Sequence, residues 1–202
     1  MNKNIIIFRE ELLPFSETFI LNQVESLSSY TGIYVGFCRT RKKSLVLPKQ
    51  RTIILGDIVK LSSRRSILLK LTGIASPKLY KYLRKFSPHL IHAHFGIDGV
   101  WALPIASQLK VPLIVTFHGH GITVNEQSEN LTNIYGPLYK AYFWKRQNLF
   151  SKARYCIAIS QFIRSQLIAK GCPEHKIKVH YIGIDIDKFT PKNHIVREPI
   201  VL

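Results

Sequence analysis

Two pairs of histidines, each separated by one residue, are the side chains in this sequence best suited to chemistry. His92 and His94 lie in one apolar stretch, and His118 and His120 flank a single glycine. The spacing suits imidazole ligands of a metal ion, but no Asp, Glu or Cys accompanies these histidines at ligand spacing. We therefore predict no metal site. We expect His92 to be buried in a structural role and His94 to lie nearer a ligand crevice.

The segment that leads to His118 predicts where the second pair lies. Residues 111–118 form a nearly continuous apolar run rich in β-branched residues, and Gly119 and Gly121 allow the backbone to turn after it. Such a run is typical of a central parallel strand, which is covered on both faces. In open α/β sheets the ligand crevice lies beyond the carboxyl ends of these strands, so we expect His118 and His120 at its edge. Two loop histidines near a turn are the alternative interpretation.

The remaining periodicity predicts strands that alternate with helices along the whole chain. We expect strands at 4–8, 32–38, 52–55, 90–94, 111–118, 155–159 and 177–182. We expect helices at 17–28, 58–74, 78–86, 98–109, 137–152 and 161–170. This alternation predicts an α/β fold, a single Rossmann-like, doubly wound, mostly parallel sheet. The domain is expected to cover residues 1–190, and the polar residues 191–202 to begin a connection to a further domain.

Cysteine usage and hydropathy indicate the compartment. Cys38, Cys156 and Cys172 have no paired spacing, so we predict buried thiols and neither a disulfide framework nor a zinc site. No window approaches about 18 consecutive apolar residues, and the apolar N-terminal stretch is interrupted at Arg9, so we predict neither a membrane span nor a signal peptide. These features favour a cytoplasmic protein.

Positive charge is concentrated in one part of the chain. The sequence has 29 Lys and Arg against 12 Asp and Glu, and residues 39–88 hold 14 of the basic residues with Asp57 as their only acid. The basic patch is defined here as Arg41, Lys42, Lys43, Arg64, Arg65, Lys78, Lys81, Arg84 and Lys85. Such a concentration predicts an anionic partner, either a phosphorylated substrate or a membrane surface. No recognition helix, RNP-like sequence or zinc-finger spacing accompanies the charge, so we expect no nucleic acid.

The helix expected at 78–86 has an apolar face backed by a cationic one. Leu79, Tyr82, Leu83 and Phe86 recur at helical spacing, and the basic residues lie opposite them. Each basic residue near an anionic membrane adds on the order of 1 kcal/mol of attraction. This pattern favours peripheral attachment at the inner face of the cytoplasmic membrane. A solvated helix surface is the alternative interpretation.

Four short stretches, which together span nearly all of the chain, share a pattern with one enzyme family. They are PFSETFI at 14–20, HAHFG at 92–96, TFHG at 116–119, and AISQFI at 158–163 continuing to VHYIGID at 179–185. In their order and spacing they resemble the N-terminal half of GT-B glycosyltransferases of family 4. The resemblance is greatest to members that build bacterial exopolysaccharide, capsule and colanic acid.

The resemblance implies a domain that holds the acceptor and faces a second Rossmann-like domain that holds a nucleotide-sugar donor. It implies hexosyl transfer with retention of anomeric configuration, without a metal or other cofactor. Together with the basic patch it implies a lipid-linked saccharide acceptor. Because the family's donor half would follow residue 202, we expect this chain alone to be inactive. A non-catalytic binding module or a truncated remnant is the alternative.

The resemblance also implies roles for individual residues. His118 and Gly119 match the family's His-Gly turn, which implies that His118 is catalytic and lies beside the reacting sugar. A polar donor there can bind a sugar hydroxyl or stabilise charge as the diphosphate leaves. Many members have an Asp two residues after that glycine, and this chain has Gly121. We therefore expect no carboxylate role at that position.

Further residues of the matching stretches are expected to bind substrate. We expect Ser16 and Glu17 to bind acceptor hydroxyls, although Ser16 could equally cap the helix that starts there. The predicted substrate-binding residues are Ser16, Glu17, Thr18, His94, Phe95, Gly96, Gly119 and His120.

Overall fold

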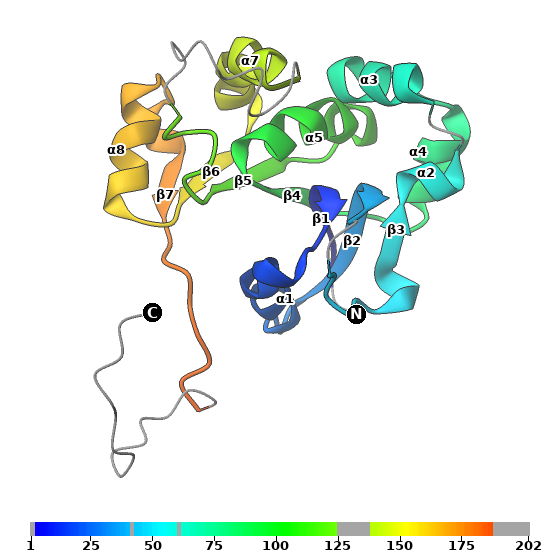
Figure 1. The fold of residues 1–202 in the computed structure, drawn as a ribbon, viewed down its shortest axis with the longest axis horizontal. Coiled ribbons are helices and arrows are strands. Elements are labelled where there is room, and N and C mark those ends of the chain that lie inside the picture. The colour runs from blue at the N-terminus through cyan, green and yellow to red at the C-terminus, as the bar shows by residue number, and fades with distance from the viewer. Residues whose placement is uncertain (1–2, 41–42, 60–61, 125–137, 188–202) are drawn as a thin grey trace.

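The computed structural model of the 202-residue chain describes residues 3–40, 43–59, 62–124 and 138–187. These residues form one seven-stranded sheet with helices on both faces (Figure 1). Every described pair of neighbouring strands is parallel, and the strand order is β3-β2-β1-β4-β5-β6-β7. The predicted α/β, Rossmann-like, doubly wound fold is confirmed.

The strands are β1 Lys3–Leu12, β2 Tyr30–Arg39, β3 Thr52–Ile54, β4 Leu90–His94, β5 Leu113–Phe117, β6 Tyr155–Ala158 and β7 Ile177–Val179. The α-helices are α1 Thr18–Glu25, α2 Leu55–Ile58, α3 Ser63–Thr72, α4 Pro77–Arg84, α5 Gly96–Leu109, α7 Leu138–Lys152 and α8 Gln161–Ala169. Short 3-10 turns lie at Phe15–Glu17, Lys49–Arg51 and Glu174–Lys176. No helix of the described ranges is both long enough and apolar enough to cross a membrane.

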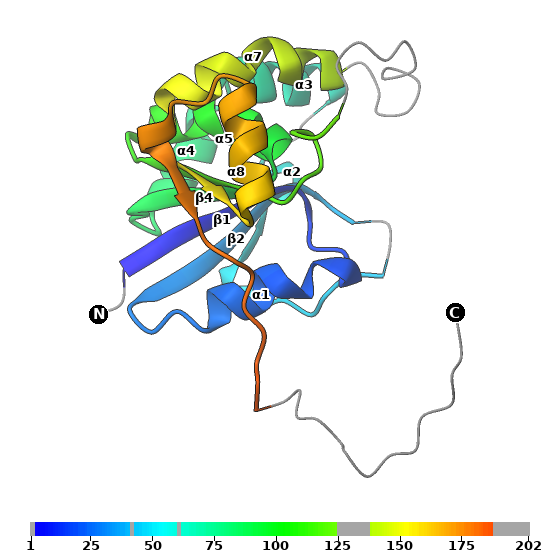
Figure 2. The same ribbon diagram turned by 90° about the vertical axis from the view of Figure 1, so that its left-hand side faces the viewer.

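Alternate residues of the central strands pack on opposite faces of the sheet, as the two-residue period of a strand requires. Ile6 and Phe8 of β1 belong to the larger core, which includes the fully buried Trp101 of α5. Ile5 and Ile7 point the other way and pack against α1. Figure 2 shows α1 on one side of the sheet and α3, α5 and α7 on the other. β1 and β2 bury side chains on both faces of the sheet, which explains their continuous apolar runs.

Several predicted elements differ in extent from the structure. The helix predicted at 58–74 begins only at Ser63, as α3, because Val59 is extended and the Ser62 side chain caps the new helix by accepting from the Arg65 N–H. Ile58 is the last residue of the separate helix α2. The strand predicted at 177–182 ends at Val179. The boundary expected near residue 190 lies outside the described residues.

Three local predictions are wrong. Ser16 lies in the 3-10 turn before α1 and caps no helix, because the N-cap positions of that turn and of α1 are Pro14 and Glu17. In α4 the third buried apolar side chain is Tyr80 rather than Tyr82, because the Tyr80 hydroxyl reaches inward and donates to the Gly73 carbonyl. Cys38 is exposed, because it lies near the end of β2 beyond the covered part of the strand.

Candidate functional site

The strand order places a switch point between β1 and β4. From β1 the chain moves to β2 and β3 on one side and then returns to β4, β5, β6 and β7 on the other. The connections on the two sides of such a point diverge, which leaves a crevice at the carboxyl ends of the strands. Arg9 of β1, His94 at the end of β4 and His118 directly after β5 meet at this crevice.

His94 and His118 form a hydrogen-bonded pair at the base of the crevice. His94 Nδ1 lies 3.1 Å from His118 Nε2, and the two rings are stacked with their centroids 5.3 Å apart. His94 is fully buried. His94 Nε2 and His118 Nδ1 are buried and have no hydrogen-bond partner among the described residues. A buried polar atom of this kind is a candidate contact for a ligand.

The surroundings of His118 keep its ring neutral. Its imidazole lies between Phe19 and Phe95, with ring centroids 4.8 Å away on each side. Burial, followed by the charges of His92 and Arg9, lowers the pKa of His118 to about 4. Burial also lowers the pKa of His94 well below its usual value. Near neutral pH both rings are therefore uncharged, and one N–H lies between them.

His92 has the buried, structural position that the sequence predicts. Its Nε2 lies 2.7 Å from Thr116 Oγ1 on the neighbouring strand, and its ring centroid is 4.4 Å from that of His94. Burial lowers the pKa of His92 to about 4. The described residues contain no cluster of three or more His, Cys, Asp or Glu side chains that could hold a metal ion.

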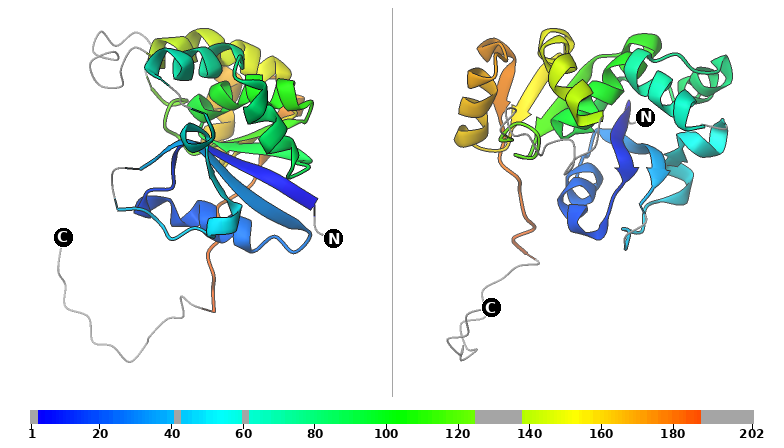
Figure 3. Two further views of the ribbon diagram at one scale, coloured as in Figure 1. Left: turned by 90° about the vertical axis from the view of Figure 1, so that its right-hand side faces the viewer. Right: turned by 45° about the horizontal axis from the view of Figure 1, so that its top comes forward.

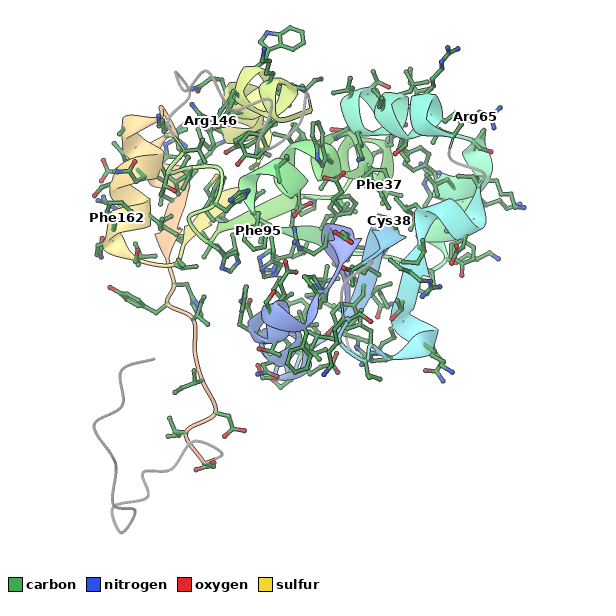
Figure 4. All side chains as sticks on the ribbon, in the orientation of Figure 1. Phe37, Cys38, Arg65, Phe95, Arg146 and Phe162 are labelled. Atoms are coloured by element: carbon green, nitrogen blue, oxygen red, sulfur yellow. The ribbon has the colours of Figure 1, made fainter. Side chains whose placement is uncertain are left out.

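Phe95 has a strained backbone between β4 and α5. Its φ is +71°, a left-handed value that is uncommon for an aromatic residue. Such conformations cost about 1–3 kcal/mol and cluster at functional sites. The Phe95 N–H donates to the Thr116 carbonyl, and its ring contacts both His118 and the Arg9 guanidinium. In Figure 4 Phe95 lies near the centre of the view, below α5 and above α1.

A buried charge cluster connects β1, α1 and α5 beside the histidines. Arg9 donates to both carboxylate oxygens of Glu17, at 2.9 and 2.5 Å, and to Asp98. The Glu10 N–H donates to Asp98 at 2.8 Å. Burial raises the pKa of Asp98 to about 7, although Arg9 and the Glu10 N–H act in the opposite direction. The cluster fixes the start of α1 against the start of α5 and so sets the width of the crevice at His118.

A groove of about 730 Å³ runs along α1 and opens beside His118. Its walls are α1 and the segment 180–185, and its floor contains Thr116 of β5, Ile157 of β6 and Ile159, which follows β6. Among the described helices only α1 lies on this face of the sheet, which leaves the β5 and β6 part open (Figure 1). The volume is within the range of about 300–1,000 Å³ that is usual for ligand sites.

A second hollow of about 430 Å³ opens at the carboxyl ends of β1 and β2, near Phe37 and Cys38 (Figure 4). It is lined by the ion pair of Glu10 with Lys70 and by Ser66, so that α3 forms one of its walls. The Trp101 indole N–H donates to the other Glu10 oxygen at 3.2 Å.

The structure brings together part of the predicted site. His118, His94, Phe95 and Glu17 meet at the crevice, and Thr18 lines the groove that leads to it. The Glu17 carboxylate is held by Arg9, so in this arrangement it shapes the crevice rather than facing the groove.

The remaining predicted substrate-binding residues lie outside the contact between His118, His94 and Phe95. Gly96 begins α5 and is buried against Phe117. Gly119 has φ +107°, which permits the turn after His118. His120 is exposed, with its ring 5.8 Å from that of Tyr139, and Ser16 is exposed outside the groove.

Sequence reasoning missed Arg9 and Asp98. Asp98 is a charged residue in an otherwise apolar segment, and Arg9 directly follows the apolar run 5–8, so the available signal was this change from apolar to charged residues. Their pairing was not predictable, because the two residues are 89 positions apart.

The described part of the basic patch is solvent-facing. Arg84 donates to the Gln108 carbonyl, Lys43 lies 4.9 Å above the Phe15 ring, and Lys85 lies 5.6 Å from the Tyr82 ring. Arg65 lies at the outer end of α3 (Figure 4). Arg41 and Lys42 fall outside the described residues.

A family model described as Glycosyltransferase Family 4 matches residues 16–188. The putative colanic acid biosynthesis glycosyltransferase WcaL of Escherichia coli is 30% identical over 133 residues, which cover 64% of this chain and 28% of WcaL. The amylovoran biosynthesis glycosyltransferase AmsK of Erwinia amylovora is 28% identical over 214 residues, which cover 88% of this chain and 50% of AmsK. The chain thus spans half or less of the length of these relatives.

A solved structure shares the fold. The crystal structure of Anabaena HepE in complex with UDP superposes with a TM-score of 0.62 at 17% identity. The match covers 95% of this chain and 47% of HepE.

Proposed function

Because the chain belongs to glycosyltransferase family 4, we propose that it is the acceptor side of a retaining hexosyltransferase. The donor is a nucleotide sugar and the acceptor is a lipid-linked saccharide of surface polysaccharide biosynthesis. AmsK and WcaL, which are named for amylovoran and colanic acid biosynthesis, support the polysaccharide context. HepE, solved with UDP, supports a nucleotide-linked donor.

The observation that carries the proposal is the position of His118. It lies at the switch-point crevice, is held by His94 and opens onto the groove of about 730 Å³. With a pKa of about 4, it meets the substrate as a neutral imidazole. A neutral ring can donate one N–H to a sugar hydroxyl or to a phosphate oxygen as the diphosphate leaves.

His94 sets which nitrogen of His118 faces the substrate. For His118 to donate through Nδ1, its Nε2 must accept a hydrogen bond from His94 Nδ1. His94 therefore acts through His118 as a positioning residue. Thr18 and the exposed side of the groove remain available to an acceptor.

We propose that the donor site lies in a further domain, which is supported by the length of AmsK, of which this chain covers 50%. The groove beside His118 is bordered by α1 and by the segment 180–185. In the proposal, the donor domain faces this groove and the sugar is held between the two domains. We expect the 202-residue chain alone to lack transfer activity. The basic patch supports a lipid-linked acceptor and a peripheral position at the cytoplasmic membrane, since it attracts anionic headgroups.

The test uses the longest reading frame that encodes this chain. Release of nucleoside diphosphate is measured with a panel of nucleotide sugars, with and without membrane extract. We expect release that depends on the extract and falls by roughly 100-fold or more in His118→Ala, the scale of a catalytic group. His175→Ala, which removes an exposed histidine of the turn Glu174–Lys176, is the matched control and should retain full activity.

Unchanged release in His118→Ala would refute the catalytic assignment. Absence of release with every donor would favour a non-catalytic binding role.

A further inference from the structure

Helix α3 buries Leu69 in the core but departs from the usual amphipathic arrangement at Ile67, Leu68 and Lys70. Lys70 is only 7% exposed, because it forms an ion pair with Glu10 and lies 4.9 Å above the Phe37 ring. Ile67 and Leu68 point outward instead and are 42% and 43% exposed. A helix on the surface of a soluble domain normally turns such residues inward. The outer side of α3 therefore offers apolar surface to a partner.

Helix α7 continues this surface. α3 and α7 both lie on the α5 side of the sheet, as the two views of Figure 3 show, and the Lys145 ammonium of α7 donates to the Leu71 carbonyl of α3 at 2.9 Å. Trp144, the neighbour of Lys145, is 83% exposed. The α3–α7 face is defined by the exposed residues Arg64, Arg65, Ile67, Leu68, Ile74, Lys140 and Trp144.

The charge of this face is of one sign. The sequence contains no Asp or Glu between Asp57 and Asp98, and none between Glu129 and Glu174, so neither helix carries an acid. Exposed aliphatic and indole groups among Arg and Lys are the composition of a surface that enters the headgroup region of an anionic bilayer. An anionic bilayer matches both kinds of group, because its phosphates pair with the basic side chains and its interfacial region takes up indole and aliphatic groups.

We propose that the α3–α7 face docks on an anionic lipid bilayer. Trp144, Ile67 and Leu68 insert among the headgroups, and Arg64 and Arg65 bind lipid phosphates. The cationic side of α4 contributes only long-range attraction, because Leu79, Tyr80 and Leu83 of that helix point into the core.

Docking through the α3–α7 face specifies which surface would attach the protein to the membrane in the proposed function. It rests on that function only in so far as the acceptor is taken to be lipid-linked. Docking is measured without donor or catalysis, so its failure and the failure of sugar transfer are separate results.

The test is co-sedimentation of the 202-residue chain with vesicles of equimolar phosphatidylcholine and phosphatidylglycerol, and with phosphatidylcholine alone. We expect binding to the anionic vesicles and little to the neutral ones. Trp144→Ala should lower the partition coefficient by about tenfold or more, given the 150–250 Å² that an aromatic side chain can bury. Trp144 is exposed, so this variant should keep the wild-type melting temperature.

Tryptophan fluorescence gives an independent readout. The chain has two tryptophans, and Trp101 is fully buried, so a blue shift on vesicle binding reports Trp144. Trp144→Phe keeps an aromatic anchor and should bind nearly as well while losing the shift. Ile67→Ser combined with Leu68→Ser should weaken binding in the same way as Trp144→Ala.

The matched control removes three charges from α4 through Lys78→Gln, Lys81→Gln and Lys85→Gln. We expect this variant to lose less binding than Trp144→Ala at physiological salt, where attraction between separated charges is largely screened. The proposal is overturned if the α4 variant loses as much binding as Trp144→Ala or more, if Trp144 shows no blue shift, or if wild type does not bind.

Discussion

Replacement of Arg9 by methionine tests the charge cluster that holds the crevice. The Arg9 side chain is 13% exposed, and those of Glu17 and Asp98 are 10% and 0% exposed. Methionine retains the apolar contact with Phe95 but leaves two buried carboxylates without their cation. Removal of one partner of a buried ion pair costs about 3–5 kcal/mol, because an uncompensated charge remains. We predict a loss of this size in the free energy of unfolding.

The assay is urea denaturation of the 202-residue chain at neutral pH, followed by circular dichroism. A triple variant, Arg9→Met with Glu17→Gln and Asp98→Asn, is the matched control, because it removes all three charges at nearly constant shape. We expect it to recover most of the loss, since a buried ion pair and its neutral replacement are often similar in stability.

The pH dependence of Arg9→Met gives a second check. Without Arg9, burial raises the folded-state pKa of Asp98 further above its value in the unfolded chain. The folded state then binds more protons between those two pKa values, so its stability increases as pH falls through the folded pKa. Because the Asp98 pKa of folded wild type is already about 7, the stability gap should narrow as pH falls from the alkaline side towards 7 and should change little between pH 7 and pH 4. A single-variant loss below about 1 kcal/mol, or a triple variant no more stable than the single one, would refute the reasoning.

Three further predictions concern buried groups. The pKa of His92 is about 4 against 6.5 for a free imidazole, so its contribution to the free energy of unfolding is complete above pH 6.5. In urea titrations the stability advantage of wild type over His92→Gln should therefore shrink by about 3 kcal/mol from pH 6.5 to pH 4. An advantage that does not change with pH would contradict this. Gly96→Ala places a Cβ 2.7 Å from the Phe117 ring and should cost about 1–3 kcal/mol in thermal unfolding, whereas Gly183→Ala, with no atom within 4 Å, should cost little. Cys38 should react alone with a thiol reagent in the native chain, and mass spectrometry showing equal labelling of all three cysteines would contradict the burial of the other two.

The sequence predicted those parts of the fold that depend on local pattern. The apolar run at 111–118 is a central strand of residues Leu113–Phe117, and His118 follows it at the crevice as expected. The same two-residue period placed His92 and His94 on one face of β4. These predictions succeeded because a buried strand of a parallel sheet is rich in apolar and β-branched residues.

Features that depend on tertiary contacts were not predictable. Lys70 of α3 is buried because it pairs with Glu10, 60 positions away, so no clear amphipathic pattern marks the outer face of the helix. Tyr80 replaces Tyr82 in the core because its hydroxyl finds the Gly73 carbonyl. The first case depends on a partner that is distant in sequence, and the second on a choice between two tyrosines that lie two positions apart.

The most direct test of the central claim follows the sugar itself. The full reading frame is incubated with labelled nucleotide sugar and membrane extract, and label is measured in the extracted lipid-linked saccharide. The account predicts transfer by wild type and His175→Ala, and a fall of roughly 100-fold or more in His118→Ala. Equal transfer by His118→Ala and His175→Ala would contradict the role of His118, and label that appears only as free sugar would contradict the lipid-linked acceptor.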